Sequence, residues 1–218
     1  HGKTVEERAL ALISIAHPDF RAQLLREAIE SRYVRQELSD IGDRIVVGSP
    51  DLPTTLLLPD GTQFDFRLIH PTDEPGLRDL FYQLSKQSIY YRFMSLMRWV
   101  PHKQIQDFVY IDHRTEVAIV GTLPEAYGED IIALGGYYLD ASTNRAEVAF
   151  VVSDTWQNRG IATFMMRRLT TIAKRNGIRG FTAETLPENK SMQSVFYHSG
   201  LKVSSRVAEG VVHFEMDF

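Results

Sequence analysis

The sequence predicts an α/β fold of the α+β type: a mixed central sheet with helices on both faces, preceded by a helical appendage. The first observation behind this prediction is the order of elements from residue 63 onward, which reads β-α-α-β-β-β-α-β-α-β-β. The second is the stretch 147–200, where an apolar run, a glycine-containing loop and an amphipathic segment follow one another. The chain has 218 residues, 44% of them hydrophobic and 24% charged, so it can bury the core that such a fold needs.

The segment 4–38 is predicted to be helical. Thr4 and Glu7 form a capping box ahead of a periodic apolar stretch. Pro18 can open a second helix, with Asp19 in its first turn. We therefore expect two helices in the appendage.

The segment 39–59 is irregular, because glycine and proline interrupt it repeatedly. It contains two short strand-like runs, 45–47 and 54–58, and Asp60-Gly61 then predicts a hairpin turn. The remaining elements are expected as strand 63–69, helices 73–84, 86–98 and 102–109, strands 116–122, 131–139 and 145–152, helix 160–176, strand 180–186, helix 189–198 and strands 201–207 and 211–217.

The loop 157–162 carries the clearest chemical signal. It follows the apolar run 148–152, and the apolar residues after it recur at helical spacing. The first N–H groups of a helix have no partner within it and lie at the positive end of its dipole, so Gly160 would let a pyrophosphate approach the backbone. Arg159 is a cation where the dipole alone disfavours one, which fits an anion between them. The alternative is an ordinary strand–turn–helix corner.

Composition excludes several classes of chemistry. The net charge of −4 does not favour a nucleic-acid or anionic-membrane partner. The absence of cysteine excludes disulfides, thiolate metal sites and a covalent cysteine intermediate, and the histidines lack metal-like spacing. No apolar run approaches the length of a membrane span and no signal peptide is visible, so we expect a cytoplasmic protein without a metal.

The residues 157–162, Gln-Asn-Arg-Gly-Ile-Ala, resemble the acetyl-CoA pyrophosphate loop of the GNAT family of N-acetyltransferases, whose pattern is Gln/Arg-x-x-Gly-x-Gly/Ala. The residues 186–189, Leu-Pro-Glu-Asn, resemble the next strand end and helix of that family, and the resemblance covers residues 63–218. Trp156 with this second motif looks most like the bacterial protein-lysine acetyltransferases. The resemblance implies a GNAT-like, mostly antiparallel sheet, acetyl-CoA as co-substrate, and a protein lysine or a small amine as acceptor.

The same resemblance implies roles for particular residues. The strand before the loop would pair with the pantetheine amides as an extra strand would, and the loop would hold the pyrophosphate. Asn189 would reach the pantetheine arm or a nearby water in addition to capping a helix. The segment 84–93 resembles the part of the fold that lines the acceptor cleft. The implied cofactor-binding residues are Phe150, Val151, Val152, Gln157, Asn158, Arg159, Gly160, Ile161, Ala162 and Asn189.

Acetyl transfer to an amine needs a base, because a free lysine has a pKa of about 10.4 and must lose protons during the reaction. Glu147 is the candidate: an apolar strand would raise its pKa toward neutrality, and a glutamate occupies this point of the motif in the bacterial protein acetyltransferases. The alternative is a surface glutamate paired with Arg145. Where many family members carry a tyrosine as general acid, this chain has Phe196, and Tyr197 is rotated about 100° around the helix. The general acid is left open, and His198 is a second candidate base by location.

The residues 11–25 resemble the C-terminal tail of acetyl-CoA hydrolase/transferase family enzymes, and the chain begins with histidine. We therefore expect residues 1–40 to be the helical tail of an upstream CoA-transferase domain, 41–62 a linker with a possible edge hairpin, and 63–218 the acetyltransferase domain. Direct acetyl transfer to a protein lysine is the leading hypothesis. A non-catalytic acetyl-CoA sensor of a fused CoA-transferase and a small-amine acetyltransferase are the alternatives, and a functional base would exclude the sensor.

Overall fold

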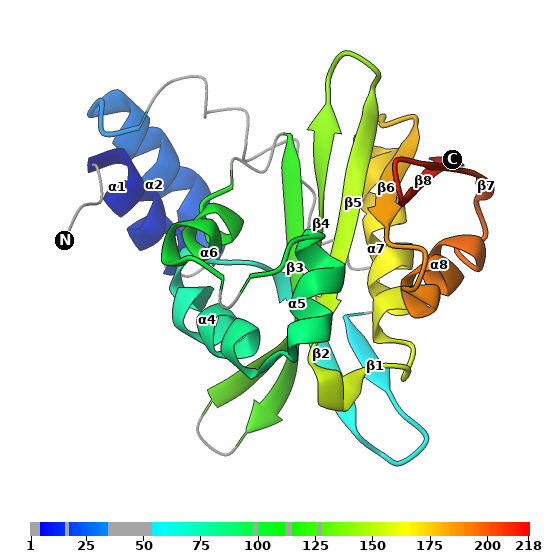
Figure 1. The fold of residues 1–218 in the computed structure, drawn as a ribbon. Helices are drawn as coiled ribbons and strands as arrows, with labels where there is room; N and C mark the ends of the chain where they lie inside the picture. The colour runs from blue at the N-terminus through cyan, green and yellow to red at the C-terminus, as the bar shows by residue number, and fades with distance from the viewer. Residues whose placement is uncertain (1–4, 16–17, 35–53, 98–99, 112–114, 126–127) are drawn as a thin grey trace.

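The computed structural model describes residues 5–15, 18–34, 54–97, 100–111, 115–125 and 128–218. The described strands form one eight-stranded sheet in the order β1-β2-β3-β4-β5-β6-β8-β7 (Figure 1). All neighbouring strands are antiparallel except β5 and β6, which are parallel. The expected mixed, mostly antiparallel sheet with helices on both faces is confirmed.

The elements follow the chain in the expected order. The strands are β1 (Thr55–Leu57), β2 (Gln63–Leu68), β3 (Glu116–Glu125), β4 (Gly128–Asp140), β5 (Arg145–Val152), β6 (Gly180–Thr185), β7 (Lys202–Ala208) and β8 (Val211–Asp217). The α-helices are α1 (Val5–Ile15), α2 (Pro18–Glu30), α4 (Glu74–Gln83), α5 (Lys86–Phe93), α6 (His102–Val109), α7 (Ile161–Arg175) and α8 (Lys190–Tyr197). Two short 3-10 helices are η2 (Pro71–Asp73) and η3 (Asp154–Trp156).

One predicted helix is clearly too long. We expected a helix over 86–98, but α5 ends at Phe93 because Met94 adopts a left-handed conformation with φ 51°. The β1–β2 hairpin forms at Asp60-Gly61, where Gly61 has φ 86° and the Thr62 N–H donates to the Asp60 carboxylate at 2.9 Å. The strand-like run 45–47 lies outside the described residues.

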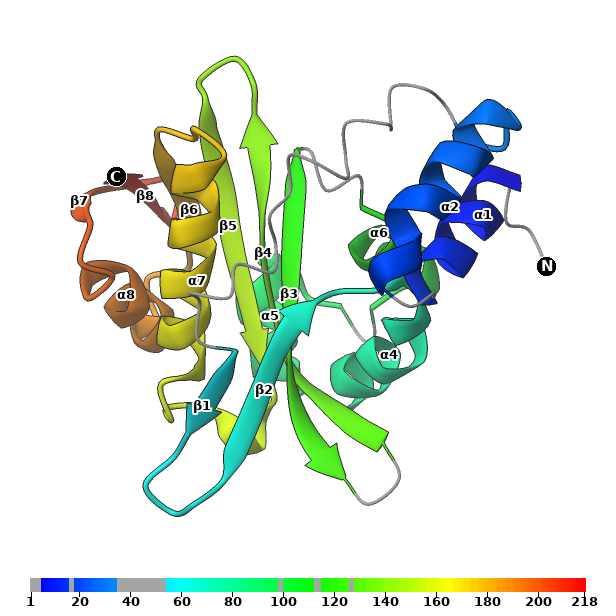
Figure 2. The ribbon, with the colours of Figure 1, turned by 180° about the vertical axis from the view of Figure 1, so that it is seen from behind.

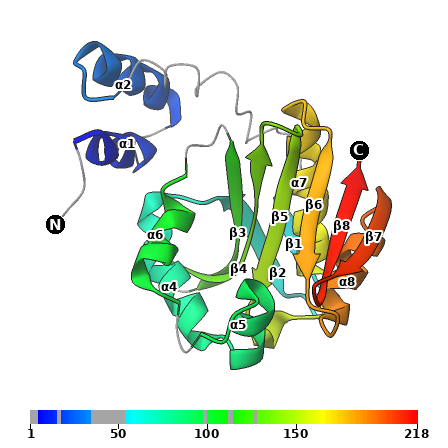
Figure 3. The same cartoon turned by 45° about the horizontal axis from the view of Figure 1, so that its top comes forward.

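Two hydrophobic cores hold the helices on opposite faces of the sheet, because successive side chains of a strand point to opposite faces. On one face, Met165 and Leu169 of α7 pack with Phe150 of β5 in a core that also takes in α8. On the other face, Ile89 of α5 packs with Val151 in a core shared by α4 and α6. Figure 2 shows α7 on the back of the sheet, and Figure 3 shows α4, α5 and α6 grouped on the other side.

The appendage is a helical hairpin beside this sheet. α1 and α2 pack on each other, and α1 contacts η2. Figures 1 and 2 both place the pair next to α4 and α6. Neither hydrophobic core includes a described residue of α1 or α2. The two helices match the prediction for this segment, while the domain boundaries stay predictions.

The parallel strands β5 and β6 separate along their length. The register pairs residues 145–147 of β5 with 180–182 of β6 and then ends, although β5 continues to Val152 and β6 to Thr185. The other edge of β5 remains paired with β4 as far as Val152. The second half of β5 therefore presents backbone groups toward the opening between the two strands.

Candidate active site

A cavity of about 660 Å³ occupies the opening between β5 and β6. Residues 148–152 of β5 line one wall, and residues of β6 and α8 line the opposite wall. The loop 157–162 and the start of α7 close one end, and α5 contributes Ser88, Tyr91 and Arg92. The cavity thus joins the predicted anion-binding loop to an unpaired strand edge, which suits a long ligand with a charged end.

The loop 157–162 turns the chain into α7 through two left-handed residues. Asn158 has φ 60° and Gly160, the N-cap of α7, has φ 84°. A Cβ on Gly160 would meet no atom within 4 Å, so the glycine is required by its backbone conformation and leaves the N-terminal amides of α7 open to the cavity. The helix N-terminus expected from the sequence is present, and it lines the cavity.

Arg159 does not point to this opening. Its guanidinium pairs with Asp60 of the β1–β2 turn at 3.2 Å and lies 4.8 Å from the centre of the Trp156 ring. Arg159 is absent from the residues that line the cavity. The cation next to the helix N-terminus is therefore compensated by a carboxylate of the protein, and the role expected for Arg159 toward a cofactor stays a prediction.

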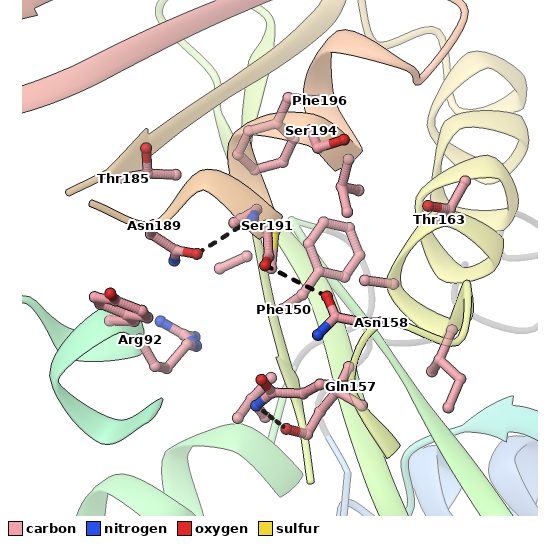
Figure 4. Close-up of a pocket in the computed structure, with 18 of the residues that line it drawn as sticks. Arg92, Phe150, Gln157, Asn158, Thr163, Thr185, Asn189, Ser191, Ser194 and Phe196 are labelled. Atoms are coloured by element: carbon pink, nitrogen blue, oxygen red, sulfur yellow. Dashed lines mark hydrogen bonds between the residues drawn. The ribbon is translucent and has the colours of Figure 1, made fainter. Parts of the chain in front are cut away.

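Asn189 and Ser191 form the opposite rim. The Asn189 side chain accepts a hydrogen bond from the Met192 N–H at 3.2 Å, which makes it the N-cap of α8, and it also lines the cavity. Ser191 donates to the Asn158 side chain at 3.4 Å, so the two rims touch (Figure 4). The capping role expected for Asn189 is present, and its role toward a cofactor stays a prediction.

Asp154 and Gln157 fasten the loop to α5. The Asp154 carboxylate accepts hydrogen bonds from the Ser85 N–H at 2.7 Å, the Ser85 hydroxyl at 3.0 Å and the Ser88 hydroxyl at 2.5 Å. Burial acts to raise the pKa of Asp154, but the bonds from Ser88 and Ser85 outweigh it and the pKa is lowered. The Gln157 amide donates to the Ser88 hydroxyl at 3.0 Å and the Val152 carbonyl at 3.1 Å, so its nitrogen is used within the protein.

Glu147 lies at the branch point of β5 and β6, opposite Tyr138 of β4 and Thr182 of β6. Its side chain is exposed, so the apolar setting expected from the sequence is wrong. The alternative pairing is also wrong, because Arg145 bonds Asp217 and lies 2.8 Å from Glu215. Among the described residues no ion pair of Glu147 within 4.0 Å is found.

The positive charge of Arg92 interacts with the negative charge of Glu147. Burial lowers the pKa of the Arg92 guanidinium, and the Glu147 carboxylate opposes this shift. The guanidinium also lies 5.2 Å and 5.5 Å from the ring centres of Phe93 and Phe108. Since Arg92 lines the cavity, α5 brings a half-buried cation to one wall of it. Arg92 belongs to the segment expected to line the acceptor cleft.

The end of α8 offers no tyrosine to the cavity. Phe196 is 1% exposed and packs between Phe150 and Phe214 at ring separations of 6.4 Å and 5.2 Å. The Tyr197 hydroxyl bonds Ser205 at 2.8 Å on the surface. His198 lines the cavity, and its Nδ1 lies 2.8 Å from the Ser194 carbonyl, so this nitrogen donates back to its own helix.

Several cavity residues were missed in the sequence. Glu184 lines the cavity and its carboxylate lies 2.9 Å from Nδ1 of His213, its cross-strand partner on β8. The Thr185 hydroxyl is buried without a hydrogen-bond partner in the described structure. These residues belong to no motif, and only the pairing of β6 with β8 brings them together. Other lining residues without a sequence signal are Thr163, Lys190, Ser191 and Ser194.

No described helix is both long and apolar enough to cross a membrane. Within the same described ranges, no three His, Asp or Glu side chains gather as metal ligands would.

Comparison with known proteins identifies the class. Residues 80–200, more than half of the chain, match the model of the Acetyltransferase (GNAT) family. The chain therefore belongs to the GNAT family, whose members are acetyltransferases that use acetyl-CoA. Residues 1–28 match the acetyl-CoA hydrolase/transferase C-terminal domain, in agreement with the resemblance of the appendage.

Individual relatives point to the same class. The chain is 29% identical to acetyltransferase Pat of Mycolicibacterium smegmatis over 161 residues, which is 72% of this chain but only 46% of that protein. The crystal structure of the GNAT domain of S. lividans PAT is 31% identical, with a TM-score of 0.68, and the match covers 75% of this chain and 96% of that one. RimL, a ribosomal alpha-N-protein acetyltransferase solved with coenzyme A, shares the fold at 13% identity and a TM-score of 0.58, over 75% and 98% of the two chains. The chain thus spans about half the length of the mycobacterial relative.

Proposed function

We propose that this chain transfers the acetyl group of acetyl-CoA directly to the side-chain amine of a protein lysine, with Glu147 as general base. The observation that supports this most is the cavity itself, which runs from the N-terminus of α7 along the unpaired edge of β5 and begins one residue beyond Glu147. The donor would lie in the opening and the acceptor would approach from the Glu147 side.

The cofactor assignment follows from the shape and chemistry of the cavity. A pyrophosphate at the loop 157–162 would accept hydrogen bonds from the first amides of α7. The pantetheine amides would then pair with the backbone of Phe150, Val151 and Val152, as an added strand pairs with a sheet edge. The volume of about 660 Å³ lies within the range of small-molecule sites. In this arrangement the thioester reaches the branch point of β5 and β6.

The chemistry needs one nucleophile, one base and donors for an oxyanion. The neutral amine attacks the thioester carbon, and a tetrahedral oxyanion forms that backbone N–H groups of β5 can stabilise. The C–S bond then breaks and the electron pair leaves with the sulfur of CoA. Glu147, directly or through a water, takes a proton from the amine nitrogen, and the thiolate leaves readily enough that a strong general acid is not required. Arg92 would add a positive charge to this side of the cavity.

The acceptor assignment is supported by the exposure of this end of the site. Glu147 and its cross-strand neighbour Tyr138 are both exposed, and Tyr138 retains 56% of its surface. A lysine on the surface of another protein can reach such a carboxylate, whereas a small amine would find little to enclose it. The resemblance of residues 156–157 and 186–189 to bacterial protein-lysine acetyltransferases points the same way.

The test replaces the proposed base while keeping its shape. Glu147→Gln should lower kcat by roughly 10²- to 10⁴-fold, the usual worth of a general base, and leave the Kd for acetyl-CoA nearly unchanged. Glu209→Gln is the matched control, because Glu209 is exposed, does not line the cavity and belongs to neither sequence motif. Turnover is measured with acetyl-CoA against a panel of purified proteins and small amines, with sites of acetylation read by mass spectrometry.

The outcomes separate the competing functions. Wild-type rates for Glu147→Gln across pH would place the base elsewhere, and His198 would be tested next. If a small amine is acetylated faster than every protein tested, the acceptor is a small amine and not a protein lysine. Tight acetyl-CoA binding without transfer to any amine would favour a non-catalytic acetyl-CoA sensor. The match of residues 1–28 to an acetyl-CoA hydrolase/transferase domain would then connect this sensor to a fused enzyme.

A further inference from the structure

The helix α5 is too short to be stable through its own backbone hydrogen bonds alone. It has eight residues, and isolated helices of this length are marginal in water. Ile89 is its buried residue, and the left-handed Met94 ends it. Its N-cap Ser85 accepts a hydrogen bond from the Ser88 N–H at 3.1 Å. The placement of α5 therefore depends strongly on contacts from outside the helix.

The strongest polar contacts come from the segment that leads into the pyrophosphate loop. Asp154 accepts three hydrogen bonds from Ser85 and Ser88, using both carboxylate oxygens. Its negative charge also lies at the positive end of the α5 dipole. Gln157 adds a bond to Ser88 and lies 3.3 Å from the Asp154 carboxylate. The N-terminus of α5 is thus bonded to two residues at the start of the loop.

The other end of α5 serves the acceptor side. Tyr91 and Arg92 line the cavity one turn beyond Ser88, and Arg92 interacts electrostatically with Glu147. A tilt of α5 at its N-terminus would move these side chains together, because they belong to one short helix. Hydrogen bonds therefore connect the start of the loop to α5 through Asp154, and the electrostatic interaction of Arg92 with Glu147 extends this connection to the proposed base.

We propose that Asp154 is a positioning residue that couples the pyrophosphate loop to α5, so that binding of acetyl-CoA orders the helix that carries Arg92 toward Glu147. This inference rests on the proposed function, because it takes acetyl-CoA to be the ligand of the loop. A ligand that immobilises the loop also immobilises the partners of Ser85 and Ser88, and part of the ordering cost of α5 is then met before the acceptor arrives. By reciprocity, ordering α5 would tighten the binding of acetyl-CoA.

Hydrogen–deuterium exchange of the peptide 85–94, with acetyl-CoA as the probe, tests this coupling. In the wild type, saturating acetyl-CoA should slow exchange both at 157–165 and at 85–94, by about fivefold or more at the second segment. In Asp154→Asn only one side-chain oxygen can accept hydrogen bonds, whereas the three donors of Ser85 and Ser88 use both oxygens of the wild-type carboxylate. In this variant 85–94 should exchange faster without ligand, and acetyl-CoA should protect 157–165 alone.

A matched control removes a similar carboxylate elsewhere. Asp140 is the last residue of β4, before the turn to β5, and accepts hydrogen bonds from the Ser142 N–H at 2.9 Å and the Ser142 hydroxyl at 2.7 Å. Asp140→Asn should leave the protection of 85–94 as in the wild type. If Asp154→Asn does not fold, Ser88→Ala should reproduce its pattern and Ser88→Thr, which keeps the hydroxyl, should restore protection.

The results separate three conclusions. Equal protection of 85–94 in the wild type and in Asp154→Asn would overturn the coupling, even if the helix exchanges faster without ligand, because Asp154 would then be a cap and nothing more. Protection of 157–165 alone in the wild type would overturn it as well. No protection at either segment in the wild type would remove the acetyl-CoA assignment itself, and the coupling with it.

Discussion

Replacing Gly160 by asparagine and, separately, by aspartate isolates the effect of charge at the predicted pyrophosphate site. Gly160 has φ 84° and ψ 0°, and a Cβ there would meet no atom within 4 Å. Asparagine and aspartate fit this space and visit the left-handed region more readily than other side chains. The two variants have the same shape, so the difference between their affinities for acetyl-CoA reports the added charge.

The size of the difference follows from the exposure of the loop. A unit charge about 5 Å from a phosphate charge costs about 1 kcal/mol in water and about 3 kcal/mol at an effective dielectric constant of 20. Gly160 is exposed at the rim of the cavity, which places the expected value between these limits. The Kd of Gly160→Asp should therefore exceed that of Gly160→Asn by about 5- to 150-fold.

Isothermal titration calorimetry with acetyl-CoA measures both constants. Gly177 supplies the control, because it also has positive φ, 72°, and open space for a Cβ, but it lies beyond the C-terminal end of α7. Gly177→Asp and Gly177→Asn should bind acetyl-CoA alike, and raising the salt from about 0.05 M to about 0.5 M should shrink the Gly160 difference. Wild-type affinity in Gly160→Asp would refute the placement of the pyrophosphate on this loop.

Three further predictions concern stability and domain structure. Deleting residues 1–40 should leave acetyl-CoA affinity unchanged, because neither core includes a described residue of α1 or α2, and loss of cooperative melting in the remainder would contradict this. Gly180→Ala should lower the free energy of unfolding in urea by about 1–3 kcal/mol, since its Cβ would clash with the Met216 carbonyl oxygen, and an unchanged midpoint would show that β8 yields freely. The lowered pKa of Asp154 contributes stability that is present above the ordinary value near 3.8 and is lost as pH falls through the lowered one, so Asp154→Asn should flatten the acidic limb of stability against pH.

Local patterns were sufficient to predict the elements that form the loop. The apolar run 148–152, the glycine at 160 and the periodic stripe after it each act within a few residues, so their structure follows from backbone sterics and burial of one helix face. The strand, the left-handed Gly160 and α7 are all present. The C-terminal end of α5 could not be predicted from local patterns. The residues after Arg92 include no glycine or proline before Pro101, and the residue that ends the helix is a methionine in the left-handed conformation.

The prediction that Glu147 has an apolar environment was wrong, and the alternation of residues along the strand already argues against it. Its neighbours Ala146 and Val148 are apolar and buried, which suggested an apolar environment. In a strand, however, adjacent side chains point to opposite faces, and the residues that share a face with Glu147 are Arg145 and Ala149. Alternation therefore predicts that the apolar neighbours face α7 while the carboxylate faces the other side. What alternation cannot show is that Arg145 is already engaged by β8.

The contacts that organise the site join residues far apart in the chain. Arg159 pairs with Asp60, and Asp154 bonds Ser85 and Ser88; the partners are 99, 69 and 66 positions apart in the sequence. From the local sequence, Arg159 was expected beside a bound anion and Asp60 in a hairpin turn. Only the folded chain shows the Arg159–Asp60 pair and the bonds of Asp154 with Ser85 and Ser88, because a side chain on a loop bonds the element that folding brings next to it.

This distribution of contacts has a chemical consequence for the proposed reaction. The proposed base, the half-buried cation and the proposed cofactor loop lie on three elements, β5, α5 and the segment 154–160. Among the described residues, no backbone-to-backbone hydrogen bond joins α5 to either of the other two elements, and the register of β5 with β6 ends at Glu147. An opening that admits a cofactor cannot also be closed by a ladder of strand hydrogen bonds. Side-chain bonds such as those of Asp154 must then hold the geometry, and they can be tightened by the ligand in a way that a strand ladder cannot.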